Sequence, residues 1–195
     1  MKSSISAFLT ACILGSCGLV PSGTAPRNLD NACSIVEQRP QYLRAFKATE
    51  RRWGVPVNVQ MAVIHQESRF KANAKTPMRY ILGIIPRGRQ SSAYGYAQAL
   101  DGTWEEYKKS TGRFMVRRSN IRDATDFMGW HMNNTRLQNG IPLSNAKNQY
   151  LAYHEGQSGY ARGSYRKKAW LLSVANKVSR RASMYKTQLR RCNKI

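Results

Sequence analysis

Apolar side chains recur at helical spacing along most of this chain. Apolar positions three and four residues apart predict six helices, at roughly 34–52, 56–68, 101–111, 123–138, 145–155 and 165–190. No stretch carries a convincing signal for a β-hairpin, which would need alternating apolar and polar residues around a tight turn. The pattern therefore predicts a mainly α fold, and 195 residues suit one domain with one hydrophobic core.

The helical pattern is clearest near the C-terminus. One face of the last predicted helix is formed by Leu171, Val174, Val178, Ala182, Tyr185 and Leu189. Lys and Arg occupy much of the other side, and no Asp or Glu follows Glu155. We expect a long basic C-terminal helix, whose charged face is either plain solvated surface or a surface that steers the chain toward an anionic polymer.

Residues 71–92, after the second predicted helix, follow no clear period. They include an apolar cluster from Met78 to Ile85, bounded by Pro77 and Pro86. The cluster could be a lid, a small hairpin or extra core. Local packing against the domain is the expectation, because apolar clusters under long loops usually form satellite cores.

The first residues of the chain predict export. Residues 1–16 carry one positive charge at Lys2 and then a short apolar run that cannot span a bilayer, which is typical of a signal peptide. The sequence Leu14-Gly15-Ser16-Cys17 resembles a bacterial lipobox and implies that Cys17 is lipidated. An ordinary secretory signal, with Cys17 incidental, is the alternative.

The lipobox resemblance also implies a location. Residue 18 is Gly and not the aspartate that retains such lipoproteins at the inner membrane, so we expect a lipid anchor on the periplasmic face of the outer membrane. Residues 17–33 are rich in Gly, Pro and small polar types and are expected to form a lipidated tether. The folded domain would then cover residues 34–195.

Two cysteines remain in the exported part of the chain. Cys33 and Cys192 lie near its two ends, and an oxidising compartment favours a disulfide between them. Two free, buried thiols are the alternative.

The net charge of the chain indicates what kind of partner it binds. The chain has 32 Lys and Arg against 10 Asp and Glu, a net charge of +22, which predicts an anionic partner. No recognisable nucleic-acid-binding motif accompanies this charge, and an exported chain meets the carboxylates of the bacterial wall instead. Peptidoglycan is therefore the expected partner, besides the membrane through the N-terminal lipid, and nucleic acid is not.

Glu67 is the main candidate for chemistry. It follows Val63 by four residues and Ile64 by three, which places its carboxyl on the apolar stripe of the helix predicted at 56–68. Desolvation there should raise its pKa, so that the carboxyl could hold a proton near neutral pH and act as a general acid. A structural glutamate at the helix end, paired with Arg69 or a Lys, is the alternative.

Three ordered motifs carry a family resemblance. They are His65-Gln66-Glu67-Ser68-Arg69-Phe70, Tyr94-Gly95-Tyr96-Ala97-Gln98 and Ala152-Tyr153-His154-Glu155-Gly156. Together they resemble the motifs of soluble-type lytic transglycosylase domains, across most of residues 45–160. The resemblance implies a mainly α, lysozyme-like single domain built around a buried catalytic helix.

The resemblance also implies residue roles. Glu67 would be the single catalytic acid/base, Ser68 a neighbouring polar group, Gln98 a hydrogen-bonding group toward the substrate and Tyr153 a hydroxyl near the Glu67 carboxyl. His154 stands where the family usually has asparagine, so contacts at that position depart from the family pattern.

Aromatic side chains near the motifs could stack on sugar faces. Tyr96 and Tyr160 are the candidates for this role. The three histidines share no metal-like spacing with Cys or paired carboxylates, so neither a metal site nor a cofactor is expected.

The implied reaction is a lyase reaction on peptidoglycan. Glu67 would break the β-1,4 bond after N-acetylmuramic acid and leave 1,6-anhydromuramoyl ends. A hydrolytic muramidase resembling goose-type lysozyme is one alternative, and it would ordinarily need a second carboxylate such as Glu155. Glu155 lies beside Gly156 at a helix end, where a solvent-exposed glutamate is expected. A non-catalytic wall-binding lipoprotein is the other alternative.

Overall fold

A computed structural model describes residues 24–82 and 84–195 of the chain. The predicted signal peptide and the predicted lipidation site, Cys17, lie outside these residues. The described part is mainly helical and forms one domain, as the apolar pattern predicted. In these residues no helix is long and apolar enough to cross a membrane.

All six predicted helical regions form helices. The helices are α1 (Ala32–Gln38), α2 (Pro40–Trp53), α3 (Val57–Ser68), α4 (Asp101–Thr111), α5 (Ile121–Asn139), α6 (Ala146–Glu155), α7 (Gln157–Ala161) and α8 (Ala169–Arg191), with a 3₁₀ helix, η1 (Ser164–Lys167). The region predicted as one helix at 34–52 is divided at Pro40, which has no N–H to continue a helix. α7 was not predicted, because it is too short to show a period. The helix predicted to start at residue 165 begins at Ala169, after the short η1.

Asparagine side chains begin three of the helices. Asn31 accepts a hydrogen bond from the Ser34 N–H at 3.0 Å, and Asn120 accepts from Arg122 and Asp123 at the start of α5. Asn145 does the same at the start of α6. These caps satisfy N–H groups that have no partner inside a helix, so they define where each helix starts.

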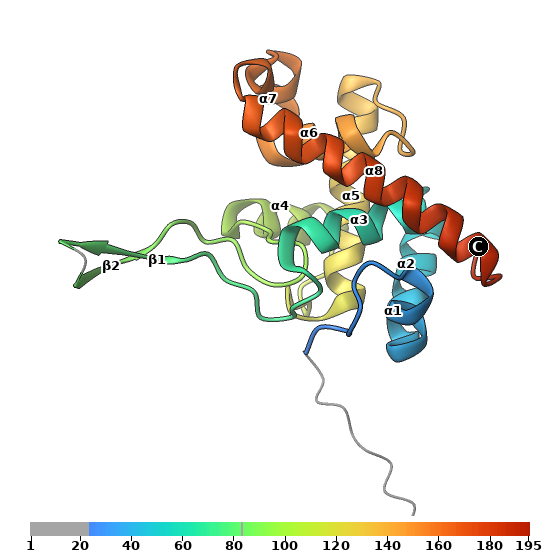
Figure 1. The fold of residues 1–195 in the computed structure, drawn as a ribbon. Coiled ribbons are helices and arrows are strands. Elements are labelled where there is room, and N and C mark those ends of the chain that lie inside the picture. The colour runs from blue at the N-terminus through green and yellow to red at the C-terminus, as the bar shows by residue number, and fades with distance from the viewer. Residues whose placement is uncertain (1–23, 83) are drawn as a thin grey trace, which may run out of the picture.

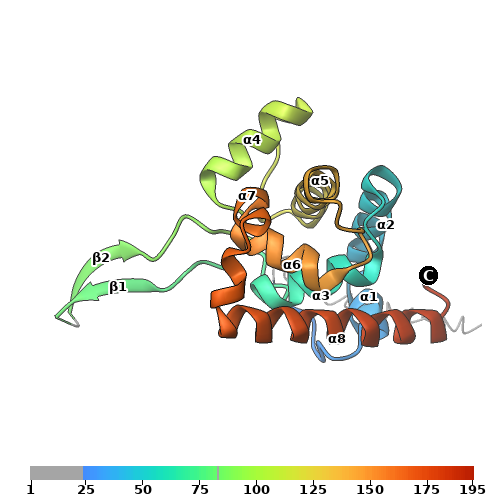
Figure 2. The ribbon, with the colours of Figure 1, turned by 90° about the horizontal axis from the view of Figure 1, so that it is seen from above.

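α3 lies at the centre of the domain. Nine of its twelve residues are buried, which confirms the predicted buried helix. It packs against α2, α5, α6 and α8, and α8 runs along one side of the molecule (Figure 2). The face of α8 that packs inward contains Leu171, Val178, Ala182, Tyr185 and Leu189, as predicted, with Ala175 buried and Val174 only partly covered.

The segment 71–92 forms an exposed hairpin and not a satellite core. Strands β1 (Met78–Ile81) and β2 (Ile85–Arg89) pair antiparallel and project from the helical body (Figure 1). All residues of both strands are exposed, so the expectation of local packing was wrong. The hairpin carries no alternating pattern because neither of its faces is buried, and alternation arises when one face is.

The N-terminal boundary of the domain lies earlier than predicted. Ala25 and Leu29 pack against the hydrophobic core, and Gln38 exchanges two hydrogen bonds with the backbone of Arg27. Residues 24–33 are therefore part of the packed domain, and a tether extending to residue 33 was wrong.

The predicted disulfide is present. Cys33 in α1 is bonded to Cys192 at the end of α8, across a sequence separation of 159 residues. Gln188 adds hydrogen bonds between the same segments, accepting from the Ala32 N–H at 2.8 Å and donating to the Asp30 carbonyl at 2.9 Å. The two ends of the described chain are thus joined covalently and by hydrogen bonds.

Candidate active site

Glu67 lies in the last turn of α3, immediately before the helix ends. The helix ends because Arg69 and Phe70 adopt left-handed backbone angles, with φ of 51° and 60°. Phe70 is fully buried and stacks on Tyr42 with ring centroids 5.9 Å apart. Packing of Phe70 therefore holds the end of the helix in place and, with it, the carboxyl of Glu67.

The environment of Glu67 favours the protonated carboxyl. The side chain is half-buried, and burial raises its pKa from 4.5 to about 7, against a hydrogen bond from Tyr150 that lowers it. No ion pair within the described residues involves Glu67, and Arg69 does not contribute to its pKa. The alternative of a helix-end glutamate paired with Arg69 is not what the structure shows.

Two tyrosines of α6 lie beside the Glu67 carboxyl. Tyr150 is 5% exposed and its hydroxyl donates a hydrogen bond to the carboxylate. The Tyr153 hydroxyl instead donates to the Ala97 carbonyl at 2.6 Å, and the pKa of Tyr153 is raised by burial and by the negative charge of Glu67. Tyr150 was missed in the sequence, although residues three apart share a helix face and Tyr150 precedes Tyr153 by three.

The hydrogen bond from Tyr153 to the Ala97 carbonyl joins the turn at residues 94–98 to α6. Gly95 has φ of +80°, and a Cβ there would be 2.1 Å from the Arg118 carbonyl oxygen, so only glycine fits. Gln98 donates from Nε2 to the carbonyls of Ala74 at 3.0 Å and Gly95 at 2.8 Å. Gln98 was predicted to hydrogen-bond a substrate, but its amide nitrogen instead holds the turn together.

Two other predicted site residues, Tyr96 and Ser68, are buried and bond to groups inside the domain. Tyr96 is 4% exposed, its hydroxyl is 2.9 Å from that of Tyr42, and the two rings meet edge to face. The stacking role predicted for Tyr96 was wrong, because its ring is part of the core. The Ser68 hydroxyl is buried and donates to the Ile64 carbonyl of its own helix at 3.2 Å.

Glu155 is a buried, paired carboxylate and not the exposed one expected from its position. Its side chain is 4% exposed and binds the Lys168 ammonium at 2.7 Å, His154 Nδ1 at 2.9 Å and the Ser164 hydroxyl. Burial by itself would raise the pKa of Glu155, but hydrogen bonds from Lys168, Ser164 and His154 lower it to about 2. The helix end at Gly156 is covered by the chain that follows, which the local sequence does not reveal.

His154 and Tyr160 lie on the outer side of this region. The His154 ring meets Trp170 edge to face at 5.1 Å, and Trp170 is 57% exposed. One face of the Tyr160 ring is stacked on Tyr165 at 4.9 Å, and Tyr160 itself is half-buried. Tyr160 thus keeps a partly accessible ring, whereas Tyr96 does not.

His131 of α5 packs behind Tyr153 with ring centroids 4.8 Å apart. Burial lowers its pKa to about 4, so it is a neutral side chain near neutral pH. Among the described residues, no group of three His, Cys, Asp or Glu side chains could hold a metal ion.

Replacing Glu67 with glutamine is expected to stabilise the fold at alkaline pH. The pKa of Glu67 is 4.5 when unfolded and about 7 when folded, so the unfolded chain loses this proton first and stability falls as the pH rises from 4.5 to 7. Glutamine does not titrate, so the variant avoids this loss. Its free energy of unfolding should exceed that of the wild type by about 3 kcal/mol above pH 7, and this difference should vanish below pH 4. Urea unfolding at pH 4 and pH 8 measures the difference.

The matched control for this stability measurement is Glu105→Gln. Glu105 is 55% exposed and pairs only with Lys108 on the surface of α4, so the same chemical change there should alter stability little at either pH. A Glu67→Gln gain that is equal at pH 4 and pH 8 would contradict a raised pKa of the folded carboxyl.

The fold and the site define a lysozyme-like helical domain with one protonatable glutamate at the end of its central helix. Two motifs far apart in sequence, the end of α3 and α6, meet at this carboxyl, and the turn at 94–98 is joined to α6 by the hydrogen bond from Tyr153 to Ala97. The chain matches the Transglycosylase SLT domain family over residues 5–192 and therefore belongs to it. No match is found among curated proteins.

Proposed function

We propose that this protein is a peptidoglycan lytic transglycosylase that uses Glu67 as its single general acid/base. It would cleave the β-1,4 bond between N-acetylmuramic acid and N-acetylglucosamine and leave 1,6-anhydromuramoyl ends. The observation that carries the proposal is the half-buried Glu67 carboxyl, whose pKa is raised by burial to about 7. Membership of the transglycosylase SLT domain family supports peptidoglycan as the substrate.

The reaction needs one group that gives and takes one proton. Protonated Glu67 donates its proton to the glycosidic oxygen as the bond to C1 of N-acetylmuramic acid breaks. The resulting carboxylate accepts the proton of the C6 hydroxyl of the same sugar, whose oxygen bonds to C1 and closes the anhydro ring. Glu67 is protonated again at the end, and no water is consumed. A pKa near the working pH suits both steps.

The other buried carboxylates support a mechanism with one catalytic carboxylate. Glu155 is held by Lys168, Ser164 and His154. Asp126 accepts hydrogen bonds from Arg52, Trp53, Tyr107 and Arg113, among side chains of α2, α4 and α5. Neither contributes to the pKa of Glu67. A hydrolase of the two-carboxylate kind would need a second free carboxylate across the bond.

The identity of the product tests the proposed reaction. Isolated sacculi are incubated with the protein, and released muropeptides are identified by liquid chromatography and mass spectrometry. Anhydro ends are expected. Reducing ends would show that the protein is a hydrolytic muramidase. Binding to sacculi without released products would favour a non-catalytic wall-binding lipoprotein.

We also propose that Cys17 carries a lipid and holds the protein at the periplasmic face of the outer membrane. The support is the sequence Leu14-Gly15-Ser16-Cys17. Labelled palmitate should enter the wild-type chain and not a Cys17→Ser variant, and membrane fractionation should place the labelled chain in the outer membrane. A labelled Cys17→Ser variant would contradict the assignment.

Replacing Tyr150 with phenylalanine is expected to shift the pH dependence of cleavage upward. The Tyr150 hydroxyl lowers the pKa of Glu67 by hydrogen bonding to the ionised carboxylate, so its removal raises that pKa. Glu67 then stays protonated to higher pH, and the alkaline limb of the kcat/KM profile moves with it. Initial rates on sacculi from pH 5 to pH 9 measure the limb.

Tyr153→Phe is the matched control for the pH profile. Its hydroxyl donates to Ala97 and makes no hydrogen bond to Glu67, so the alkaline limb should stay in place even if the rate changes. Equal limbs in wild type and Tyr150→Phe would show that the Glu67 carboxyl is not the titrating acid or that Tyr150 does not bind it.

A further inference from the structure

The hairpin of β1 and β2 exposes a contiguous apolar tip. Leu82 is 87% exposed and Ile84 77% exposed, and Ile81 and Ile85 are 45% and 53% exposed. Contiguous exposed apolar side chains mark interaction surfaces, whereas single ones do not. A two-stranded hairpin is also only marginally stable by itself. A partner that covers this tip would therefore remove apolar surface from water and stabilise the hairpin.

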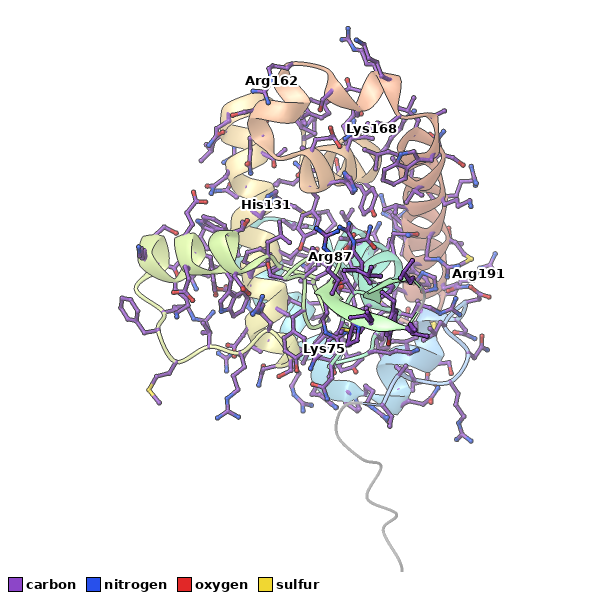
Figure 3. The ribbon with its side chains drawn as sticks, turned by 90° about the vertical axis from the view of Figure 1, so that its left-hand side faces the viewer. Lys75, Arg87, His131, Arg162, Lys168 and Arg191 are labelled. Carbon is purple, nitrogen blue, oxygen red and sulfur yellow. A yellow bond between two sulfur atoms is a disulfide. The ribbon has the colours of Figure 1, made fainter. Side chains whose placement is uncertain are left out.

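Apolar and basic side chains are separated along the length of the hairpin. The apolar tip consists of Tyr80, Ile81, Leu82, Ile84, Ile85 and Pro86. The basic base, nearer the body, contains Lys75, Arg79, Arg87 and Arg89. Lys75 and Arg87 lie on the side of the molecule that faces the viewer in Figure 3, which looks from the hairpin side. No Asp or Glu occurs anywhere in residues 68–100, so this basic charge is not neutralised by the segment itself.

Both faces of the tip are apolar. Successive side chains of a strand point to opposite faces, so Tyr80 and Ile81 lie on opposite sides of the hairpin, and they are 55% and 45% exposed. A flat protein surface or a sheet edge would cover one of these faces and leave the other in water. A medium that surrounds the tip covers both, and lipid acyl chains are such a medium.

We propose that the hairpin tip inserts into the interfacial region of a lipid bilayer with anionic headgroups. Three strand residues at about 3.4 Å each reach roughly 10 Å, which matches the 5–10 Å depth of interfacial segments. Arg79 and Arg87 then lie at headgroup level, where basic side chains are attracted to anionic lipids. Tyr80 lies at the boundary, a position that tyrosine favours in membranes.

Membrane contact at the hairpin would also position the candidate active site, because the hairpin is connected to it along the chain. The hairpin lies between α3, which ends beside Glu67, and the turn at 94–98. Insertion of the tip therefore holds the Glu67 end of the domain at a defined height above the lipid surface. The inference concerns binding alone and does not depend on the proposed reaction.

Vesicle sedimentation tests the proposal. A chain with Cys17→Ser, which cannot be lipidated there, is mixed with phosphatidylcholine vesicles with and without phosphatidylglycerol. Binding to the anionic vesicles is expected, and Leu82→Ser with Ile84→Ser should weaken it about tenfold or more, since two apolar side chains lose their burial. These changes leave the net charge unaltered.

The matched control carries Met115→Ser and Leu137→Ser. These residues are 100% and 65% exposed but lie outside the hairpin, so the control should bind as the parent does. Equal binding by parent and tip variant, or equal loss in tip variant and control, overturns the proposal. A concentration-dependent dimer lost only in the tip variant would identify a second copy as the partner and also overturn it.

A second measurement separates insertion from attraction by charge. An environment-sensitive fluorophore is attached at Leu82→Cys or at Leu137→Cys, in a chain with Cys12→Ser and Cys17→Ser. A blue shift with anionic vesicles is expected at residue 82 and not at residue 137. Binding without a shift at residue 82 would mean that the cations alone hold the protein, and the insertion proposal would fail.

Discussion

Glu67→Gln is expected to lower the rate of peptidoglycan cleavage by about 10²- to 10⁴-fold, which is the usual contribution of a general acid/base. Glutamine has the shape of glutamate but can neither donate the proton to the glycosidic oxygen nor accept the one from the C6 hydroxyl. Binding to sacculi should remain, because the positive charge and the fold do not depend on this carboxyl. Release of anhydromuropeptides over time measures the rate, and co-sedimentation with sacculi measures binding.

Glu105→Gln is the matched control for this loss of activity. It makes the same chemical change at an exposed position on α4, so its rate should equal that of the wild type. A Glu67→Gln rate near the wild-type rate would overturn the assignment of Glu67. Loss of both activity and sacculus binding would point to a damaged fold. A cooperative unfolding curve at pH 8, with a midpoint no lower than that of the wild type, would show that the fold is intact.

Removing the disulfide is expected to lower the free energy of unfolding by about 4 to 5 kcal/mol. The bond between Cys33 and Cys192 closes a loop of 159 residues, and so long a loop restricts the unfolded chain strongly. This loss is about a third or more of a typical domain stability of about 5–15 kcal/mol. Denaturant unfolding of a variant with Cys33→Ser and Cys192→Ser measures the loss.

Reductant supplies the control for the disulfide. Wild-type protein with a reducing agent should unfold at the midpoint of the double variant, and the reducing agent should not change the midpoint of the variant itself. Equal stability of variant and oxidised wild type would contradict a constraining role of the bond. Hydrogen bonds of Gln188 would then account for the attachment of α1 to α8.

Helical periodicity was enough to predict most of the fold. The apolar stripe of α8 and the continuous apolar run of α3 each reflect burial of a regular face, so position in sequence translates directly into position in space. Elements without a buried face were not predictable in this way. The exposed hairpin and the short α7 leave no periodic pattern, and the packing of residues 24–33 depends on contacts with α8.

Local pattern also indicated Glu67, because its spacing from Val63 and Ile64 puts a carboxyl on an apolar stripe. It did not identify Tyr150, which binds the carboxylate from a helix 83 positions along the chain. Nor did it show that Tyr96 is buried against Tyr42 or that Glu155 is paired with Lys168. Each of these outcomes depends on which segment packs against which.

The sequence by itself therefore determined the six long helical regions, the position of Glu67 in a buried helix and the pairing of two cysteines, since each follows from spacing or from residue type. Only the tertiary structure decided which side chains surround the Glu67 carboxyl, which aromatic rings are buried and where the apolar cluster at 78–85 lies. The physical reason is that burial and hydrogen bonding between distant segments arise when helices pack, and no local spacing encodes those contacts.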